Sequence, residues 1–255
     1  MRTWLKWTLG VAGGLVLLAV VFGGGSEPDD GGGASEAGGD DGATPATGAT
    51  TTTPAGTTTT TTPPSAPAGR APPPAISFEG SGKRATDEFS TEDGLLRVTM
   101  RHDGSSNFIV WLLDAGTGEQ EALLVNEIGA YDAARYVSVP PGRYVMDVTA
   151  DGAWSVTVAQ PRPTDGRAPP TSDAGDRDAA PEPLRLSRGL HRFAMTHQGE
   201  GNFIVWLLDA QGRQVDLLAN EIGPWEGEAA IGVPRDGVYV MDVVADGPWT
   251  IAVAS

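Results

Sequence analysis

The sequence predicts an all-β protein: two tandem β-sandwich repeats that follow an N-terminal hydrophobic helix and a disordered stalk. Three observations predict this fold class. The nonapeptide NFIVWLLDA occurs at 107–115 and again at 202–210, and internal repeats of this kind mark a duplicated structural unit. Beyond the stalk, short apolar runs alternate with Gly, Asp and Pro, and no long helical period accompanies them. Within most runs apolar and polar residues alternate, which is typical of strands with one buried face.

The first segment, residues 1–25, has the features of a signal anchor or a signal peptide. Arg2 and Lys6 precede an apolar stretch of roughly 15 to 18 residues. This length lies between that of a signal-peptide core and that of a full membrane span. Positive charge ahead of such a stretch keeps the N-terminus in the cytoplasm. We therefore expect a single-pass cell-membrane protein with extracytoplasmic C-terminal domains. Cleavage near the small residues at 23–26 would instead give a secreted protein.

Residues 26–75 form a low-complexity segment rich in Gly, Thr and Pro. Such a composition cannot assemble a hydrophobic core, so we expect a disordered stalk. Clustered Thr with Pro is also the composition of O-glycosylated stalks. The stalk would place the repeats at a distance from the membrane.

Repeat 1 is predicted at 76–160, a linker at 161–182 and repeat 2 at 183–255. The matching segments of the two repeats are offset by 95 residues at 94–115, by 94 at 123–131 and by 95 again from Tyr144. The linker is rich in Pro and Asp, and repeat 2 shows no counterpart of the opening stretch ISFEGSG (76–82). Strands are predicted in repeat 1 near 84–90, 95–102, 107–114, 120–126, 134–139, 142–150 and 153–159.

The nonapeptide differs from the other predicted strands because it is apolar on both faces. Phe108 and Val110 point to one side, whereas Ile109 and Trp111 point to the other. A strand of this kind belongs in the middle of a sheet with both faces covered. We expect the other repeat, or a long loop, to cover the second face, and inter-repeat packing through Trp111 and Trp206 is one such arrangement.

Composition restricts the function classes. The formal net charge is −16 and there is no cysteine. Without cysteine the chain has neither a disulfide framework nor a thiolate zinc site. An acidic surface repels phosphate backbones, so nucleic acid is not an expected partner. The charge is typical of a surface that maintains solubility.

No motif predicts an enzyme. There is no G-x-S-x-G motif and no Ser, His and Asp set, and the single equivalent histidine of each repeat, His102 and His197, is expected to be structural. We therefore assign no catalytic residue, while a carboxylate pair in so acidic a chain leaves an undetected hydrolase as an alternative. No cofactor is expected.

Calcium is the one metal that the acidic residues leave open. Oxygen-bearing side chains recur at equivalent positions of the two repeats, as calcium sites in loops require. They lack the spacing of a dedicated calcium loop, and Asn and Asp at strand ends usually form turns. These residues are Asn107, Asn202, Asp114, Asp209, Asn126, Asn220, Glu127, Glu221, Asp147, Asp242, Asp151 and Asp246.

Tyr131 and Trp225 are the candidate ligand-binding aromatics. They follow the NEIG motif of each repeat, in segments predicted to be loops, and Glu127 and Glu221 of that motif stand nearby. An aromatic ring beside carboxylates is suited to stack on a sugar ring or to clamp a peptide. The alternative is that the two rings close the open end of each sandwich.

The segments DEFSTEDGLLRVTM, NFIVWLLDAGTGEQ and VPPGRYVMDVTADGAWSVTV resemble the framework of bacterial pre-peptidase C-terminal (PPC-like) domains. The resemblance implies a secreted β-sandwich that accompanies an enzyme or surface protein and binds substrate or cell-surface polymer. Asn107 and Asn202 stand where an acidic residue is common in that family, which weakens any calcium role.

Together these features predict a membrane-tethered extracytoplasmic module with a non-catalytic binding or structural role. The alternatives are a carbohydrate- or cell-wall-binding module that uses the loop aromatics, and the hydrolase. A polysaccharide or a surface protein would be the partner.

Overall fold

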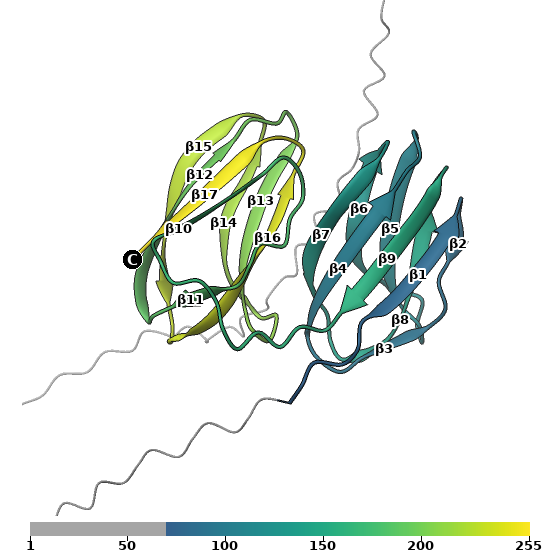
Figure 1. Ribbon diagram of the computed structural model, residues 1–255, viewed down its shortest axis with the longest axis horizontal. Coiled ribbons are helices and arrows are strands. Elements are labelled where there is room, and N and C mark those ends of the chain that lie inside the picture. The colour runs from purple at the N-terminus through teal and green to yellow at the C-terminus, as the bar shows by residue number, and fades with distance from the viewer. Residues whose placement is uncertain (1–69) are drawn as a thin grey trace, which may run out of the picture. The chain divides into compact units, whose positions relative to one another are not determined.

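The computed structural model describes residues 70–255, which belong to one compact unit, Pro63–Ser255. This part of the chain is all-β and contains no helix, as predicted (Figure 1). Accordingly, none of its segments is a helix that could span a membrane. The predicted signal segment and nearly all of the predicted stalk lie outside the described residues.

Repeat 1 is a sandwich of two antiparallel sheets. Sheet A has the strand order β1-β9-β4-β7, and sheet B has the order β2-β8-β5-β6, with β3 also paired to β8. The strands are β1 (Ile76–Ser81), β2 (Arg84–Ala85), β3 (Phe89–Thr91), β4 (Leu95–His102), β5 (Asn107–Asp114), β6 (Gln120–Ile128), β7 (Tyr131–Ser138), β8 (Gly142–Thr149) and β9 (Ala153–Ala159).

Repeat 2 has the same topology. Sheet D has the order β10-β17-β12-β15, and sheet C has the order β11-β16-β13-β14. The strands are β10 (Thr171–Gly175), β11 (Leu184–Leu186), β12 (Gly189–His197), β13 (Asn202–Asp209), β14 (Gln214–Ile222), β15 (Trp225–Val233), β16 (Gly237–Ala245) and β17 (Trp249–Ala254).

The prediction that repeat 2 lacks the opening strand is wrong, because β10 lies inside the segment 161–182 that was predicted to be a linker. β10 pairs with β17 as β1 pairs with β9, so Gly175 stands opposite Trp249 as Gly80 stands opposite Trp154. The segment TSDAG was not predicted to be a strand because it contains no large apolar residue. Its Asp173 instead forms an ion pair with Arg167 at 2.6 Å.

Each repeat buries its own hydrophobic core between its two sheets, as the alternation predicts. In β4, Leu96, Val98 and Met100 are buried in the core of repeat 1. The core of repeat 2 contains the equivalent Phe193 and Met195 of β12. Each core therefore needs only residues of its own repeat.

The two nonapeptide strands lie inside their sheets, but their second faces differ. In β13 the second face is covered by repeat 1, since Leu208 and Val240 form an inter-repeat cluster with Leu95 and Tyr136. Trp206 packs against this cluster. Trp111 and Trp206 are both half-buried, but Trp111 of β5 belongs to no such inter-repeat cluster among the described residues.

Candidate functional site

The sequence predicted that Tyr131 and Trp225 lie in loops, and this prediction is wrong. Each is the first residue of an edge strand. Tyr131 is 5% exposed, with its ring centroid 5.7 Å from that of Phe108. Trp225 is half-buried against Phe203, at 6.0 Å. Both rings thus cover the end of a core, which was the alternative interpretation of these two residues.

The two glutamates that were predicted beside these rings end the preceding strands. Glu127 lies in β6 and is exposed, whereas Glu221 lies in β14 and is half-buried. Partial desolvation, together with the carboxylates of Asp178 and Asp246, raises the pKa of Glu127 above its ordinary value. The Glu127 carboxylate is close enough to Tyr131 to act on the pKa of its hydroxyl. The four predicted residues lie in two different repeats and do not form one site.

A buried polar cluster joins the two repeats. Arg135 of β7 binds Asp242 of β16 through two hydrogen bonds, Nε to Oδ1 at 2.7 Å and Nη2 to Oδ2 at 2.6 Å. The main-chain N–H of Tyr136 donates a third hydrogen bond to Asp242 Oδ1 at 3.0 Å. This planar, bidentate arrangement is the strongest geometry of an arginine–carboxylate pair.

Asp178, from the segment after β10, completes the cluster. Its Oδ2 accepts a hydrogen bond from the Tyr131 hydroxyl at 2.8 Å, and its Oδ1 accepts one from the main chain of Ala245 at 3.0 Å. Arg135 Nη1 lies 3.7 Å from Asp178 Oδ2. One guanidinium of repeat 1 is therefore shared between two carboxylates of repeat 2.

Burial and charge act together on these groups. Burial raises the pKa of Asp178, and the nearby Arg135 only partly opposes this. Burial and the Asp178 carboxylate raise the pKa of Tyr131, so its hydroxyl stays protonated and donates. For Arg135, burial by itself lowers the pKa, but the Asp242 carboxylate outweighs it and the guanidinium remains charged.

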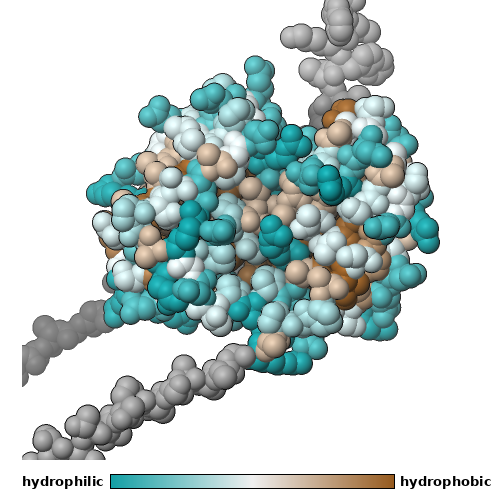
Figure 2. All heavy atoms as spheres, in the orientation of Figure 1, coloured by the Kyte–Doolittle hydropathy of each residue, from teal (hydrophilic) through white to brown (hydrophobic). Residues whose placement is uncertain are grey.

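An open groove of about 650 Å³ lies beside this cluster. Its outer lining is a row of cross-strand neighbours in sheet A, namely Glu79, Ser155, Arg101 and Asp132. Arg177 of repeat 2 also lines the groove, so both repeats contribute. Sheets A and D face the viewer in Figure 1, and Figure 2 shows that this side of the molecule is largely hydrophilic.

The charged row occurs in repeat 1 alone. At the equivalent positions of sheet D, repeat 2 has Ala174, Thr250, Thr196 and Glu226. Arg101 forms an exposed ion pair with Asp132 at 3.0 Å. The two repeats share a framework but not this row. The charged groove is therefore a feature of the surface of repeat 1 that the equivalent surface of repeat 2 lacks.

The histidines serve the fold. His102 is buried, its Nδ1 lies 2.8 Å from the carbonyl oxygen of Gly129, and its ring stacks on Phe108. His197 repeats this arrangement with Gly223 and Phe203. His191 is buried as well, with Nε2 2.8 Å from the carbonyl oxygen of Ser187.

Several of the carboxylates considered as calcium ligands bind the main chain instead. Asp114 Oδ1 accepts hydrogen bonds from the N–H groups of Gly116 and Thr117, both at 2.8 Å. Asp151 Oδ2 accepts from the N–H groups of Ser105 and Ser106. Within residues 70–255 no three His, Cys, Asp or Glu side chains form a group that would hold a metal ion.

Sequence reasoning missed the roles of Arg135, Asp178 and Asp242. Arg135 and Asp242 are separated by 107 residues, so no local pattern connects them. One signal was available: Ala229 of repeat 2 stands where repeat 1 has Arg135. The two edge strands differ throughout, YDAARYVS in β7 against WEGEAAIG in β15, whereas the nonapeptides are identical, and such local divergence points to a contact that only one copy makes.

No family model matches the chain, and no curated protein matches its sequence. Several solved structures are similar at low identity, among them the following three. The PBSX exported protein XepA is 11% identical, with a TM-score of 0.23 over 70% of this chain and 86% of that chain. A conserved protein of unknown function from Pseudomonas aeruginosa is 16% identical, with a TM-score of 0.22 over 70% and 77%.

The third is the tandem CBM22-1–CBM22-2 domain from Paenibacillus barcinonensis Xyn10C, which is 10% identical, with a TM-score of 0.23 over 70% of this chain and 86% of that chain. Similarities of this strength carry no argument about a ligand or an activity. The tandem β-sandwich fold rests on the strand pairing described above.

Proposed function

We propose that the chain is a non-catalytic binding module whose two sandwiches act as one rigid body and present the groove of repeat 1 to a ligand. The observation that carries the proposal is the Arg135–Asp242–Asp178 cluster, which fixes Arg177 of repeat 2 at the border of a groove formed by sheet A. Ligand pockets form preferentially at domain interfaces. A site to which two domains contribute residues keeps its shape only if the domains are held in a fixed arrangement, and this cluster holds them.

The groove is suited to a polyhydroxylated ligand. Carboxylates accept and guanidinium groups donate hydrogen bonds in planar, bidentate geometry, so the row from Glu79 to Asp132 offers both kinds of partner to sugar hydroxyl groups. The buried ring of Tyr131 forms part of the wall rather than a stacking platform. A polysaccharide or cell-wall polymer is therefore the ligand class that we favour.

We place the module outside the cytoplasm, at the end of the stalk formed by residues 26–75. The apolar segment within 1–25, with Arg2 and Lys6, supports an anchor, and the resemblance to PPC-like domains supports an exported accessory module. Retention of the full chain in the membrane pellet after alkaline extraction would agree with an anchor. Release into the supernatant would indicate a secreted protein.

A thermal-shift screen of the full chain in mild detergent tests the binding proposal. A ligand that binds only the folded state raises the melting temperature, so the chain is screened against soluble polysaccharides, calcium and EDTA. Arg101→Ala combined with Arg177→Ala should abolish a polysaccharide shift. The matched control is Thr196→Ala, since Thr196 is the equivalent of Arg101 in repeat 2.

Removing Arg101 costs little stability because its ion pair with Asp132 is exposed. A polysaccharide shift that survives the double substitution undiminished would exclude the groove. Turnover of a glycan by the full chain, lost when Glu79 or Asp132 is substituted, would contradict the non-catalytic assignment and favour a hydrolase.

A further inference from the structure

The outer faces of sheets B and C carry the same side chains at four equivalent positions, but within residues 70–255 only the face of sheet C is covered by the other repeat. We call the outer face of sheet B at Trp111, Leu113, Val145 and Asp147 the open face. Within it, Trp111 stands opposite Asp147 and Leu113 stands opposite Val145. We call the outer face of sheet C at the equivalent Trp206, Leu208, Val240 and Asp242 the covered face, where the same register holds.

Repeat 1 occupies the covered face with the edge strand β7. Leu208 is 3% exposed, Val240 is fully buried and Asp242 is 4% exposed. Arg135 satisfies the Asp242 carboxylate with two hydrogen bonds, and Tyr136 lies in the same apolar cluster as Leu208 and Val240. An arginine followed by an aromatic residue, both on an edge strand, is thus what this face binds within the molecule.

Among residues 70–255, no strand packs on the open face as β7 packs on the covered face. Leu113, Val145 and Asp147 are only half-buried, although their equivalents in sheet C are buried. Among residues 70–255, the side chain of Asp147 has neither an ion pair nor a hydrogen bond to another side chain, unlike Asp242. A tryptophan and two aliphatic side chains around a free carboxylate form a surface that is complementary to the Arg135–Tyr136 pair.

We propose that the open face is a docking site for an edge strand of a partner protein, and that this strand presents an arginine followed by an aromatic residue. The guanidinium would bind Asp147 as Arg135 binds Asp242, and the aromatic ring would pack on Leu113 and Val145. Charge complementarity agrees with this partner, because a chain with a net charge of −16 attracts a basic edge. The open face belongs to sheet B and the groove to sheet A, so this inference is independent of the proposed function.

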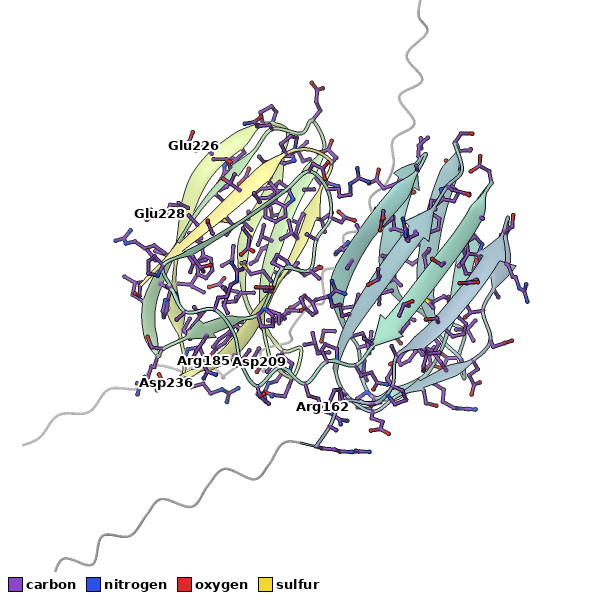
Figure 3. All side chains as sticks on the ribbon, in the orientation of Figure 1. Arg162, Arg185, Asp209, Glu226, Glu228 and Asp236 are labelled. Carbon is purple, nitrogen blue, oxygen red and sulfur yellow. The ribbon has the colours of Figure 1, made fainter. Side chains whose placement is uncertain are left out.

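A second copy of the chain does not supply this strand. Its edge strand equivalent to β7 is β15, which has Ala229 and Ala230 at the positions of Arg135 and Tyr136. Apart from β7, which already packs on its own covered face, none of its described edge strands contains an arginine followed by an aromatic residue. Figure 3 shows Glu226 and Glu228 on β15. If β15 of a second copy docked on the open face, these negative carboxylates would approach the negative Asp147 and repel it. Covering Asp147 without a cation would leave a buried unpaired charge, which is strongly unfavourable.

Introducing the missing pair into β15 tests the proposal with the full chain in mild detergent. The variant Ala229→Arg with Ala230→Tyr should self-associate head to tail, because its repeat 2 then carries the edge that the open face binds. Such an interface does not close on itself, so sedimentation velocity should show a series of oligomers. The wild type should remain monomeric at the same concentrations.

A matched pair of titrations isolates the role of Asp147. The chain with Asp147→Asn, Ala229→Arg and Ala230→Tyr cannot bind itself through Asp147, and it serves as a soluble ligand. It should bind labelled wild type, and it should bind labelled Asp147→Asn at least about thirtyfold more weakly, as expected for the loss of one partner of a desolvated charge pair. Because Ala229 packs against the core of repeat 2, the triple variant must also be shown to fold. Equal melting temperatures of wild type, Asp147→Asn and the triple variant establish that all three chains are folded.

Three results would overturn the proposal. Absence of binding between the triple variant and wild type would show that the open face does not accept an Arg–Tyr edge. Equal affinity for wild type and Asp147→Asn would place the contact elsewhere. Self-association of the wild type that Trp111→Glu abolishes would identify a second copy as the occupant.

Discussion

Asp147 and Asp242 show how the same residue acquires different properties in the two repeats. Both follow methionine in the motif YVMDV, and nothing in the local sequence distinguishes them. Arg135 distinguishes them, because it reaches only Asp242 and allows that carboxylate to be 4% exposed. A contact over 107 residues depends on the docking of two domains, which local sequence patterns do not encode.

Replacing Arg135 by Met should destabilise the protein by about 3 kcal/mol, because it leaves Asp242 as a buried charge without its partner. Chemical denaturation of the full chain measures this loss. Arg143→Met is the control: its pair with Glu88 is exposed, at 64% and 45%, so its loss should cost less than about 1 kcal/mol. A loss for Arg135→Met below about 1 kcal/mol, as small as that expected for Arg143→Met, would contradict the expected cost of leaving Asp242 unpaired.

The turn carboxylate of Asp114 should make stability depend on pH in acid. Hydrogen bonds from the N–H groups of Thr117 and Gly116 lower the pKa of Asp114 below its ordinary value of 3.8. The ionised Asp114 carboxylate therefore contributes fully to the free energy of unfolding above its unfolded-state pKa. This contribution is lost as pH falls through the folded-state pKa. We expect the difference in unfolding free energy between wild type and Asp114→Asn to shrink as pH falls from 7 toward 3.

Asp87→Asn is the control for this measurement, because the side chain of Asp87 has no hydrogen-bond partner in the part of the chain that the structure describes. A difference between wild type and Asp114→Asn that stays constant with pH would contradict the linkage.

At the scale of elements, strands with strict alternation were predictable, and the edge strands β6 and β7 were predicted with shifted ends, whereas the edge strand β10 was missed. The strands 95–102 and 107–114 agree with β4 and β5, because Gly and Asp mark their ends and apolar side chains fill the core. β10 was missed because Asp173 stands where β1 has Phe78. Tyr131 and Trp225 were assigned to loops for a different reason. The turns at the preceding glycines are tight, so each aromatic residue already belongs to the next strand.

Gly175→Ala tests whether β10 is part of repeat 2. A Cβ atom at Gly175 would stand 2.7 Å from Cζ2 of Trp249, so the tryptophan ring would have to move within the core. We expect a loss of about 1–3 kcal/mol, as for other overpacked positions. Ala174→Ser, on the exposed side of the same strand, should change stability by less than about 0.5 kcal/mol. A neutral Gly175→Ala would indicate that this segment is a linker after all.

At the scale of the molecule, duplication produced two similar sandwiches, and a few substitutions made them unequal. Repeat 1 has the Arg135–Tyr136 edge and the charged row of the groove, whereas repeat 2 has alanines, threonines and glutamates there. The sequence predicted that the other repeat, or a long loop, would cover the second face of each nonapeptide strand. It did not predict that the cover would be one-sided, because Trp111 and Trp206 stand in identical nonapeptides.

Leu208 and Leu113 therefore form a matched pair that tests the coupling between the repeats. Leu208→Ala removes apolar contact from the inter-repeat cluster and should cost about 2 kcal/mol or more. Leu113→Ala makes the same change at the half-exposed equivalent and should cost less, because that side chain has less surface removed from water.

If the cluster makes the two sandwiches one cooperative unit, calorimetry of the wild type should show a single transition, and Leu208→Ala should separate it into two, since each repeat retains its own core. Leu113→Ala should leave the single transition intact. Two transitions already in the wild type would mean that the interface positions the repeats without making them unfold together, and the groove would then have to tolerate independent opening of either domain.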